Sequence, residues 1–174
     1  MSVASAAEAF RREHDHLDVL VNKAGIVGPR GPLPEVTASE AASAFETNVF
    51  GVIRLTRAFP PLLRAAAQPR IVNVSSGVGS FTRNWEAGSD ESQVPPLIYA
   101  VTKTALAMLT LQHARALPGV QVNAADPGYT ATDLNSRRGR QSVTEGTDAI
   151  VHLATLPADG PTGVFVGRDG AVPW

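Results

Sequence analysis

The chain has no cysteine, no long apolar run and almost no net charge. Without cysteine it cannot form disulfides, use a thiolate nucleophile or bind zinc through sulfur. No run of about 18 apolar residues occurs, so a membrane span is not expected. The net charge of −1 gives no electrostatic reason to expect nucleic acid or a membrane surface as partner. The first residues lack the basic start and apolar run of a secretory signal, so we expect a cytoplasmic protein.

The composition indicates one globular domain. The chain has 174 residues, of which 44% are hydrophobic and 18% are charged. That length suffices for a sizeable core, and those fractions are ordinary for soluble proteins. We therefore expect a single domain over residues 1–174, without a linker or an internal repeat.

Helical patterns and short apolar runs alternate along the chain. Helices are expected at 3–16, 37–67, 97–117 and 142–156, and strands at 17–21, 70–76, 120–124 and 162–166. Thr37-Ala38-Ser39-Glu40 and Ser142-Val143-Thr144-Glu145 match capping boxes, and Pro60-Pro61 should bend or restart the second helix. Residues 77–96 and 128–141 are expected to be loops, and 168–170 a turn. The alternation predicts an α/β fold with a parallel sheet and helices on both faces.

Three strand ends carry polar or glycine-rich segments. These are Asn22–Gly25, Ser75–Gly77 and Pro127–Thr132. In open α/β sheets, ligands bind beyond the carboxyl ends of the strands. We therefore expect these segments to meet on one rim of the sheet and to form the functional site.

Tyr99 and Lys103 are four residues apart on the helix that follows the Ser76 loop. In a helix, both side chains would rise on one face. A phenol ionises near pH ~10, and a nearby ammonium group lowers that pKa. The pair is thus a candidate acid/base device for a carbonyl or an alcohol. The alternative is an ordinary helix with a half-buried Tyr and a solvated Lys, because this spacing also occurs by chance.

Five segments in order give the chain a family resemblance. They are Asn22-Lys23-Ala24-Gly25, Asn48-Val49-Phe50-Gly51, Ile71-Val72-Asn73-Val74-Ser75-Ser76, Tyr99-x-x-x-Lys103 and Asn123-x-x-x-Pro127-Gly128-x-x-x-Thr132. With them the chain resembles the short-chain dehydrogenase/reductase family. The ending Thr162-Gly163-Val164-Phe165 and Val172-Pro173-Trp174 is similar to its carbonyl-reductase-like branch.

The resemblance implies a role for each residue. Tyr99 would be the general acid or base, Ser76 would polarise the substrate oxygen, Lys103 would lower the pKa of Tyr99 and bind the nicotinamide ribose, and Asn48 would hold a water of a proton relay. The cofactor would be NADP or NAD, with NADP slightly favoured, and no metal is implied. The cofactor-binding residues would be Asn22, Ala24, Gly25, Tyr99, Lys103, Pro127, Gly128, Thr130 and Thr132.

Two features depart from the family pattern. No glycine precedes Gly25, so the glycine-rich turn that receives the pyrophosphate is missing. We therefore expect a partial, N-terminally truncated Rossmann-type doubly wound parallel sheet that lacks the first strands and this loop. Lys23 replaces the second Asn of the family's Asn-Asn-Ala-Gly. The strand ending at Asn22 would become an exposed edge, through which copies of the chain could associate as a homo-oligomer.

The leading functional prediction is an oxidoreductase that transfers a hydride between NAD(P)(H) and a small carbonyl or alcohol. The main alternative is a non-catalytic remnant of such an enzyme, which binds cofactor poorly or acts as an assembly partner. A related epimerase or dehydratase is ranked lower, because those enzymes usually have a larger C-terminal substrate region.

Overall fold

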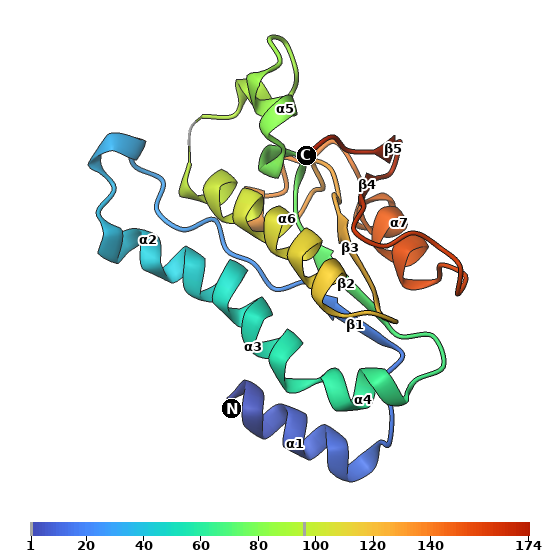
Figure 1. Ribbon diagram of the computed structural model, residues 1–174. Coiled ribbons are helices and arrows are strands. Elements are labelled where there is room, and N and C mark those ends of the chain that lie inside the picture. Colours follow the sequence, from blue (N-terminus) through green and yellow to red (C-terminus); the bar gives the residue numbers. More distant parts are fainter. Residues whose placement is uncertain (1, 96) are drawn as a thin grey trace.

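The computed structural model describes residues 2–95 and 97–174 and shows a twisted sheet between helices (Figure 1). The strands are β1 (Val19–Asn22), β2 (Arg70–Val74), β3 (Gln121–Ala125), β4 (Phe165–Gly167) and β5 (Gly170–Ala171). They lie side by side in the order β1-β2-β3-β4-β5. The first four are parallel and β5 is antiparallel to β4. The predicted α/β fold with a mainly parallel sheet is confirmed.

Helices cover both faces of the sheet. The α-helices are α1 (Val3–Glu13), α2 (Ala38–Phe45), α3 (Gly51–Ala58), α4 (Pro60–Ala65), α5 (Phe81–Trp85), α6 (Ile98–Ala116) and α7 (Val143–Ala154). In Figure 1, α7 lies on the opposite side of the sheet from α6.

Neighbouring residues of one strand supply two separate cores, because side chains alternate between the faces of a sheet. Ile71 packs with Leu62, Leu63 and Val122 on the side of α1, α3 and α4. Its neighbour Val72 joins the other cluster, formed with α7. The strand is buried on both faces, as parallel strands usually are.

The predicted long helix over 37–67 is helical along most of its length but is divided into shorter elements. After α2, the residues Glu46–Phe50 form a π-helix, and α3 then ends at Ala58. Pro60 begins α4, so the expected restart at Pro60-Pro61 is confirmed. Single π-turns inside helices often occur at functional sites, and this one contains Asn48.

The predicted loop over 77–96 holds more regular structure than the sequence indicated. It contains a 3-10 turn at Gly77–Gly79, the short helix α5 and a second 3-10 turn at Glu91–Gln93. Ser80 begins α5, because its hydroxyl accepts a hydrogen bond from the backbone N–H of Arg83 at 3.1 Å. Residue 96 lies outside the described part. Residues 80–95 are called the cap segment below.

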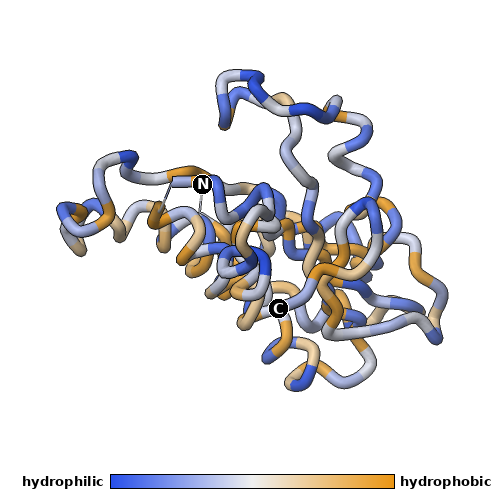
Figure 2. Tube along the Cα trace, turned by 90° about the horizontal axis from the view of Figure 1, so that it is seen from above, coloured by the Kyte–Doolittle hydropathy of each residue, from blue (hydrophilic) through white to orange (hydrophobic). Residues whose placement is uncertain are grey.

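The last strand also differs from its prediction. Pairing covers Phe165–Gly167 instead of 162–166, and the expected turn at 168–170 closes a hairpin with β5. The other elements begin and end within about three residues of the expected positions. In Figure 2, segments that stand furthest from the packed elements are mostly hydrophilic. In the part that the structure describes, no helix is long and apolar enough to cross a membrane.

Candidate active site

The turn after β2 brings Ser76 to the start of α6. Ser75 is 1% exposed, and its hydroxyl donates to the backbone carbonyl of Lys103 at 3.1 Å. Gly79 lies so close to α6 that a Cβ there would be 2.8 Å from the carbonyl carbon of Lys103. This packing holds the 3-10 turn at Gly77–Gly79 against the helix that carries Tyr99. Ser76 and this turn are together called the serine turn below.

The side chain of Ser76 lies close enough to the phenol of Tyr99 to influence its pKa. Burial raises the pKa of Tyr99 to about 12, Ser76 lowers it, and the carboxylate of Asp126 raises it. The Lys103 ammonium lies 5.5 Å from the centroid of the Tyr99 ring. The pKa of Tyr99 is therefore raised overall in this structure, because burial outweighs the influence of Ser76, and the lowering expected from Lys103 remains a prediction. The phenol is held as a proton donor.

Lys103 is a buried cation, which contradicts the alternative of a solvated lysine. It is 2% exposed, and its ammonium donates to the carbonyl of Val74 at 2.7 Å. Burial lowers the pKa of Lys103 to about 8. Gly25 faces it closely, since a Cβ there would lie 3.3 Å from Lys103 Nζ. Gly25 and Lys103, both predicted for the site, are thus neighbours.

Asn48, in the π-turn, anchors the backbone of Ile26 and also contacts helix α6. Its amide accepts from Ile26 N at 2.8 Å and donates to Ile26 O at 2.9 Å. It also donates to Thr102 Oγ1 at 2.9 Å, and its side chain is fully buried. A Cβ at Gly25 would lie 3.4 Å from Asn48 Oδ1, so this oxygen and the Lys103 ammonium face the same backbone. The predicted water relay remains a prediction.

The segment after β1 is partly inside the protein and partly outside it. Asn22 is buried and donates to Asn73 Oδ1 at 2.7 Å, and Asn73 donates to Thr110 Oγ1 at 2.9 Å. The carbonyl oxygen of the Asn22 side chain is buried without a hydrogen-bond partner among residues 2–95 and 97–174. Lys23 and Ala24 are exposed. The tie between β1 and its neighbour therefore runs through Asn22 and needs no partner at position 23.

The third predicted segment follows β3. Gly128 has φ of +65°, a conformation that favours glycine. The Thr130 hydroxyl donates to Pro127 O at 2.8 Å, while Thr132 caps the 3-10 turn Asp133–Asn135. Thr130 also pairs with Gln141 as an isolated bridge, so the predicted loop over 128–141 is closed at its base. The segment lies beside Tyr99, because Asp126 immediately precedes it and influences the phenol.

Three charged residues near the site were missed in the sequence. Arg83 and Glu91 belong to the cap segment, and Asp126 directly follows β3. Arg83 Nη1 lies 3.0 Å from Glu91 Oε1 and 3.2 Å from Asp126 Oδ2. Only Asp126 carried a signal, since it directly precedes Pro127-Gly128 at a strand end. Arg83 and Glu91 lie in a stretch without clear periodicity.

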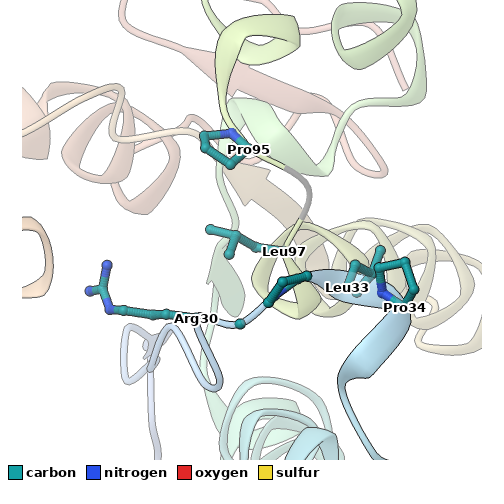
Figure 3. A pocket seen from close by; sticks show the side chains of 7 residues that line it. Arg30, Leu33, Pro34, Pro95 and Leu97 are labelled. Atoms are coloured by element: carbon teal, nitrogen blue, oxygen red, sulfur yellow. The ribbon is translucent and has the colours of Figure 1, made fainter.

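A shallow apolar groove of ≈ 410 Å³ lies where the chain enters α6. Figure 3 shows Leu97 between Pro95 and the loop that carries Arg30, Leu33 and Pro34. None of the residues that line it is Ser76, Tyr99 or Lys103. The groove is therefore a neighbour of the candidate site rather than the site itself.

The arrangement suits a carbonyl oxygen placed between Ser76 and Tyr99. A hydroxyl and a neutral phenol can both donate to such an oxygen, and the buried Lys103 ammonium lies beside the Tyr99 ring. Among the described residues, Val74 O is the hydrogen-bond acceptor of the Lys103 ammonium, which leaves donor capacity for a ribose hydroxyl. The rim thus fits the nicotinamide end of a dinucleotide. In the same described ranges, no group of three His, Cys, Asp or Glu side chains could hold a metal ion.

Comparison with known proteins agrees with this geometry. A model described as short chain dehydrogenase matches residues 1–142. The chain is 31% identical to (−)-isopiperitenone reductase of Mentha piperita, over 98% of this chain and 76% of that protein. It is 28% identical to carbonyl reductase (NADPH) 1 of Bos taurus, over 99% and 76%. Salutaridine reductase of Papaver somniferum superposes with a TM-score of 0.78 at 25% identity, over 95% of this chain and 80% of that chain. The chain therefore belongs to the short-chain dehydrogenase family and is carbonyl-reductase-like.

Proposed function

We propose that this protein is a nicotinamide-dependent oxidoreductase that reduces a carbonyl of a small molecule, or oxidises the corresponding alcohol. The observation that carries the proposal is the contact between Ser76 and the buried phenol of Tyr99, with the Lys103 ammonium beside the same ring. Membership of the short-chain dehydrogenase family and the names of the reductase relatives support the reaction class.

Each residue has a separate task in the proposed reduction. Ser76 donates a hydrogen bond to the carbonyl oxygen and polarises it. Tyr99 transfers its phenolic proton to that oxygen as the alkoxide develops. Lys103 then stabilises the tyrosinate that remains, and Asn48 contributes to the path by which a proton returns. A bound nicotinamide supplies the hydride, and the protein orients and shields it.

For the cofactor, the rim residues divide into two groups. Lys103, Tyr99 and Gly25 would border the ribose and ring, while Asn22, Ala24, Pro127, Gly128, Thr130 and Thr132 would line the rest of the site. We favour NADPH over NADH, because a relative bears NADPH in its name. The pyrophosphate has no glycine-rich turn among these 174 residues, so we expect weak binding.

Titration of the purified chain with NADPH and NADH tests cofactor binding, followed by nicotinamide fluorescence. Tyr99→Phe should keep binding but reduce carbonyl turnover by about a thousandfold or more, because the proton donor is lost. Met108→Leu on the same helix is the control, since Met108 is 55% exposed, and it should retain turnover. Equal turnover in the Tyr99→Phe protein would overturn the assignment of Tyr99.

A non-catalytic role is the second candidate, and two observations favour it. The side-chain oxygen of Asn22 is buried without a partner among the described residues, and β1 has a strand neighbour on one side only. Both indicate that this end of the sheet is incomplete as a binding surface. If neither NADPH nor NADH gives saturable binding, the non-catalytic candidate stands and the reductase proposal for this chain fails.

A further inference from the structure

One carboxylate connects the two turns that border the candidate site. The backbone N–H of Gly128 donates to Asp126 Oδ1 at 2.9 Å. The same carboxylate lies against Gly77, whose backbone lowers the pKa of Asp126 and whose Cβ position would be 3.0 Å from Asp126 Oδ2. Gly128 belongs to the turn after β3, whereas Gly77 directly follows Ser76. Asp126 is buried.

The cap segment supplies the countercharge. Arg83 bridges Asp126 and Glu91, and all three side chains are largely removed from solvent, at 30%, 7% and 17% exposure for Arg83, Asp126 and Glu91. The cluster lies directly on Gly77. A Cβ at Gly77 would lie 2.1 Å from Glu91 Oε1, 3.0 Å from Asp126 Oδ2 and 3.1 Å from Arg83 Nη1. Position 77 therefore has to be glycine for the cluster to form as it does.

We propose that Asp126 is a positioning residue that couples the serine turn to the Pro127-Gly128 turn, with Arg83 of the cap segment as its anchor. The coupling fixes the spacing between the side of the site that binds the substrate oxygen and the side that faces the nicotinamide. The catalytic part of this inference rests on the proposed function, whereas the coupling itself does not.

The chemistry favours a carboxylate at this position. The Gly128 N–H and the Arg83 guanidinium both donate to Asp126, the Gly77 backbone faces it, and an ionised carboxylate has enough acceptor sites for all of these groups. An asparagine could accept with one oxygen only and would leave Arg83 without a charge partner. Because buried hydrogen bonds to charged groups are strong, the two turns should move as one unit while Asp126 is ionised.

The protonation state of the Asp126 carboxylate can be followed without measuring catalysis. Burial raises the pKa of Asp126, Arg83 lowers it and Glu91 raises it. The groups that face it are Arg83 and Glu91 from the cap segment, Tyr99 from α6 and the backbone of Gly167 on β4. At 18.2 kDa, the chain is small enough for NMR spectra to resolve the amide resonances of individual glycines.

The test is a pH titration of the Gly77 and Gly128 amide resonances in ¹⁵N-labelled protein. Both should follow one shared apparent pKa, and Asp126→Asn should abolish that transition at both positions. Arg83→Gln should move it to higher pH and Glu91→Gln to lower pH, since the two charges act with opposite sign. Separate transitions at Gly77 and Gly128, or no movement in Arg83→Gln, would overturn the coupling. If the Asp126→Asn protein fails to fold, the other two variants still decide.

Kinetics then test the catalytic part. Asp126→Asn should lower kcat for carbonyl reduction about tenfold while the KM for NADPH changes much less, because the misplaced turns disfavour the transition state more than cofactor binding. Asp126→Glu should recover part of kcat, since the carboxylate is restored. An unchanged kcat in Asp126→Asn would overturn the positioning role. A wild-type chain that binds no cofactor would refute the proposed function and leave the amide result standing.

Discussion

At the scale of single residues, the site is built from buried polar groups whose partners are backbone atoms. Lys103 bonds Val74 O, Asn48 bonds both backbone groups of Ile26, and Asp126 accepts from the N–H of Gly128. Every residue carries a backbone carbonyl, and almost every residue carries a backbone N–H. The sequence alone therefore does not reveal which of these groups a buried side chain will bond. The same side chains therefore contribute both to the stability of the fold and to the proposed chemistry.

Asn48→Ala should destabilise the protein by roughly 2–4 kcal/mol. The substitution removes three hydrogen bonds at a fully buried side chain and leaves the Ile26 N–H and carbonyl and the Thr102 hydroxyl with a lost partner. Urea unfolding measures the change. Asn84→Ala is the control, because exposed Asn84 donates to Val78 O and Ser80 O where water can replace it. A loss no larger than that of the control would contradict the anchoring role of Asn48.

Lys103 should make the stability depend on pH in the alkaline range. Its ordinary pKa is 10.5 and burial lowers it to about 8. Between these values the unfolded chain binds a proton that the folded chain does not, so the free energy of unfolding should rise with pH. The rise should be about 2–3 kcal/mol between pH 8 and pH 10, before the raised pKa of Tyr99 reverses the trend at higher pH.

Lys103→Met should be nearly flat over the same interval, because the titrating group is gone. Unfolding midpoints in urea at several pH values compare the two proteins. Equal slopes in wild type and Lys103→Met would show that another group titrates.

At the scale of elements, close packing between helix α6 and the serine turn sets the geometry of the site. The two meet where Gly79 faces the backbone of Lys103, and where the Ser75 hydroxyl bonds the Lys103 carbonyl. The sequence predicted both elements, but neither periodicity nor capping signals reports how closely two elements approach.

Gly79→Ala should therefore move α6 away from the turn. A Cβ at position 79 would meet Lys103 backbone atoms at 2.8 and 2.9 Å, and backbone cannot yield as a flexible side chain can. We expect a loss of at least about 2 kcal/mol in stability, together with a weaker contact between Ser76 and Tyr99. Gly31→Ala is the matched control, since nothing lies within 4 Å of its Cβ position. Similar unfolding midpoints for both variants would contradict the close packing.

The helix that the sequence predicted over 37–67 illustrates another limit at this scale. The capping box at Thr37 and the restart at Pro60 were readable, because both are local signals. The π-turn at Glu46–Phe50 was not, although Asn48 and Gly51 are poor residues for a helix interior. The turn places Asn48 against Ile26 and Thr102, which are distant in sequence.

At the scale of the whole molecule, β1 and β5 are the edge strands of the sheet in the part that the structure describes, and β1 is the longer of the two. β1 pairs with β2 on one side, and Val21 is 39% exposed. The sequence-based expectation that β1 is an edge is confirmed by the strand order. An unpaired apolar strand tends to associate with another chain.

Val21→Lys should reduce association between copies of the chain, because a charge on an edge strand disfavours strand pairing. Multi-angle light scattering over a range of concentrations should show a wild-type mass that rises above 18.2 kDa and a variant mass that stays near it. Val151→Lys is the control, since Val151 is 55% exposed and lies on helix α7 rather than on an edge strand. A wild-type protein that stays monomeric at all concentrations would contradict the expectation.

The sequence by itself determined the order of helices and strands, the mainly parallel sheet and the rim on which Asn22, Ser76, Tyr99 and Pro127 gather. These follow from local patterns, namely apolar runs, caps and strand ends. The tertiary structure alone decided the charge states of Tyr99 and Lys103, the π-turn around Asn48 and the cluster of Arg83, Glu91 and Asp126. Burial and contacts between segments far apart along the chain produce these properties, and no local pattern encodes them.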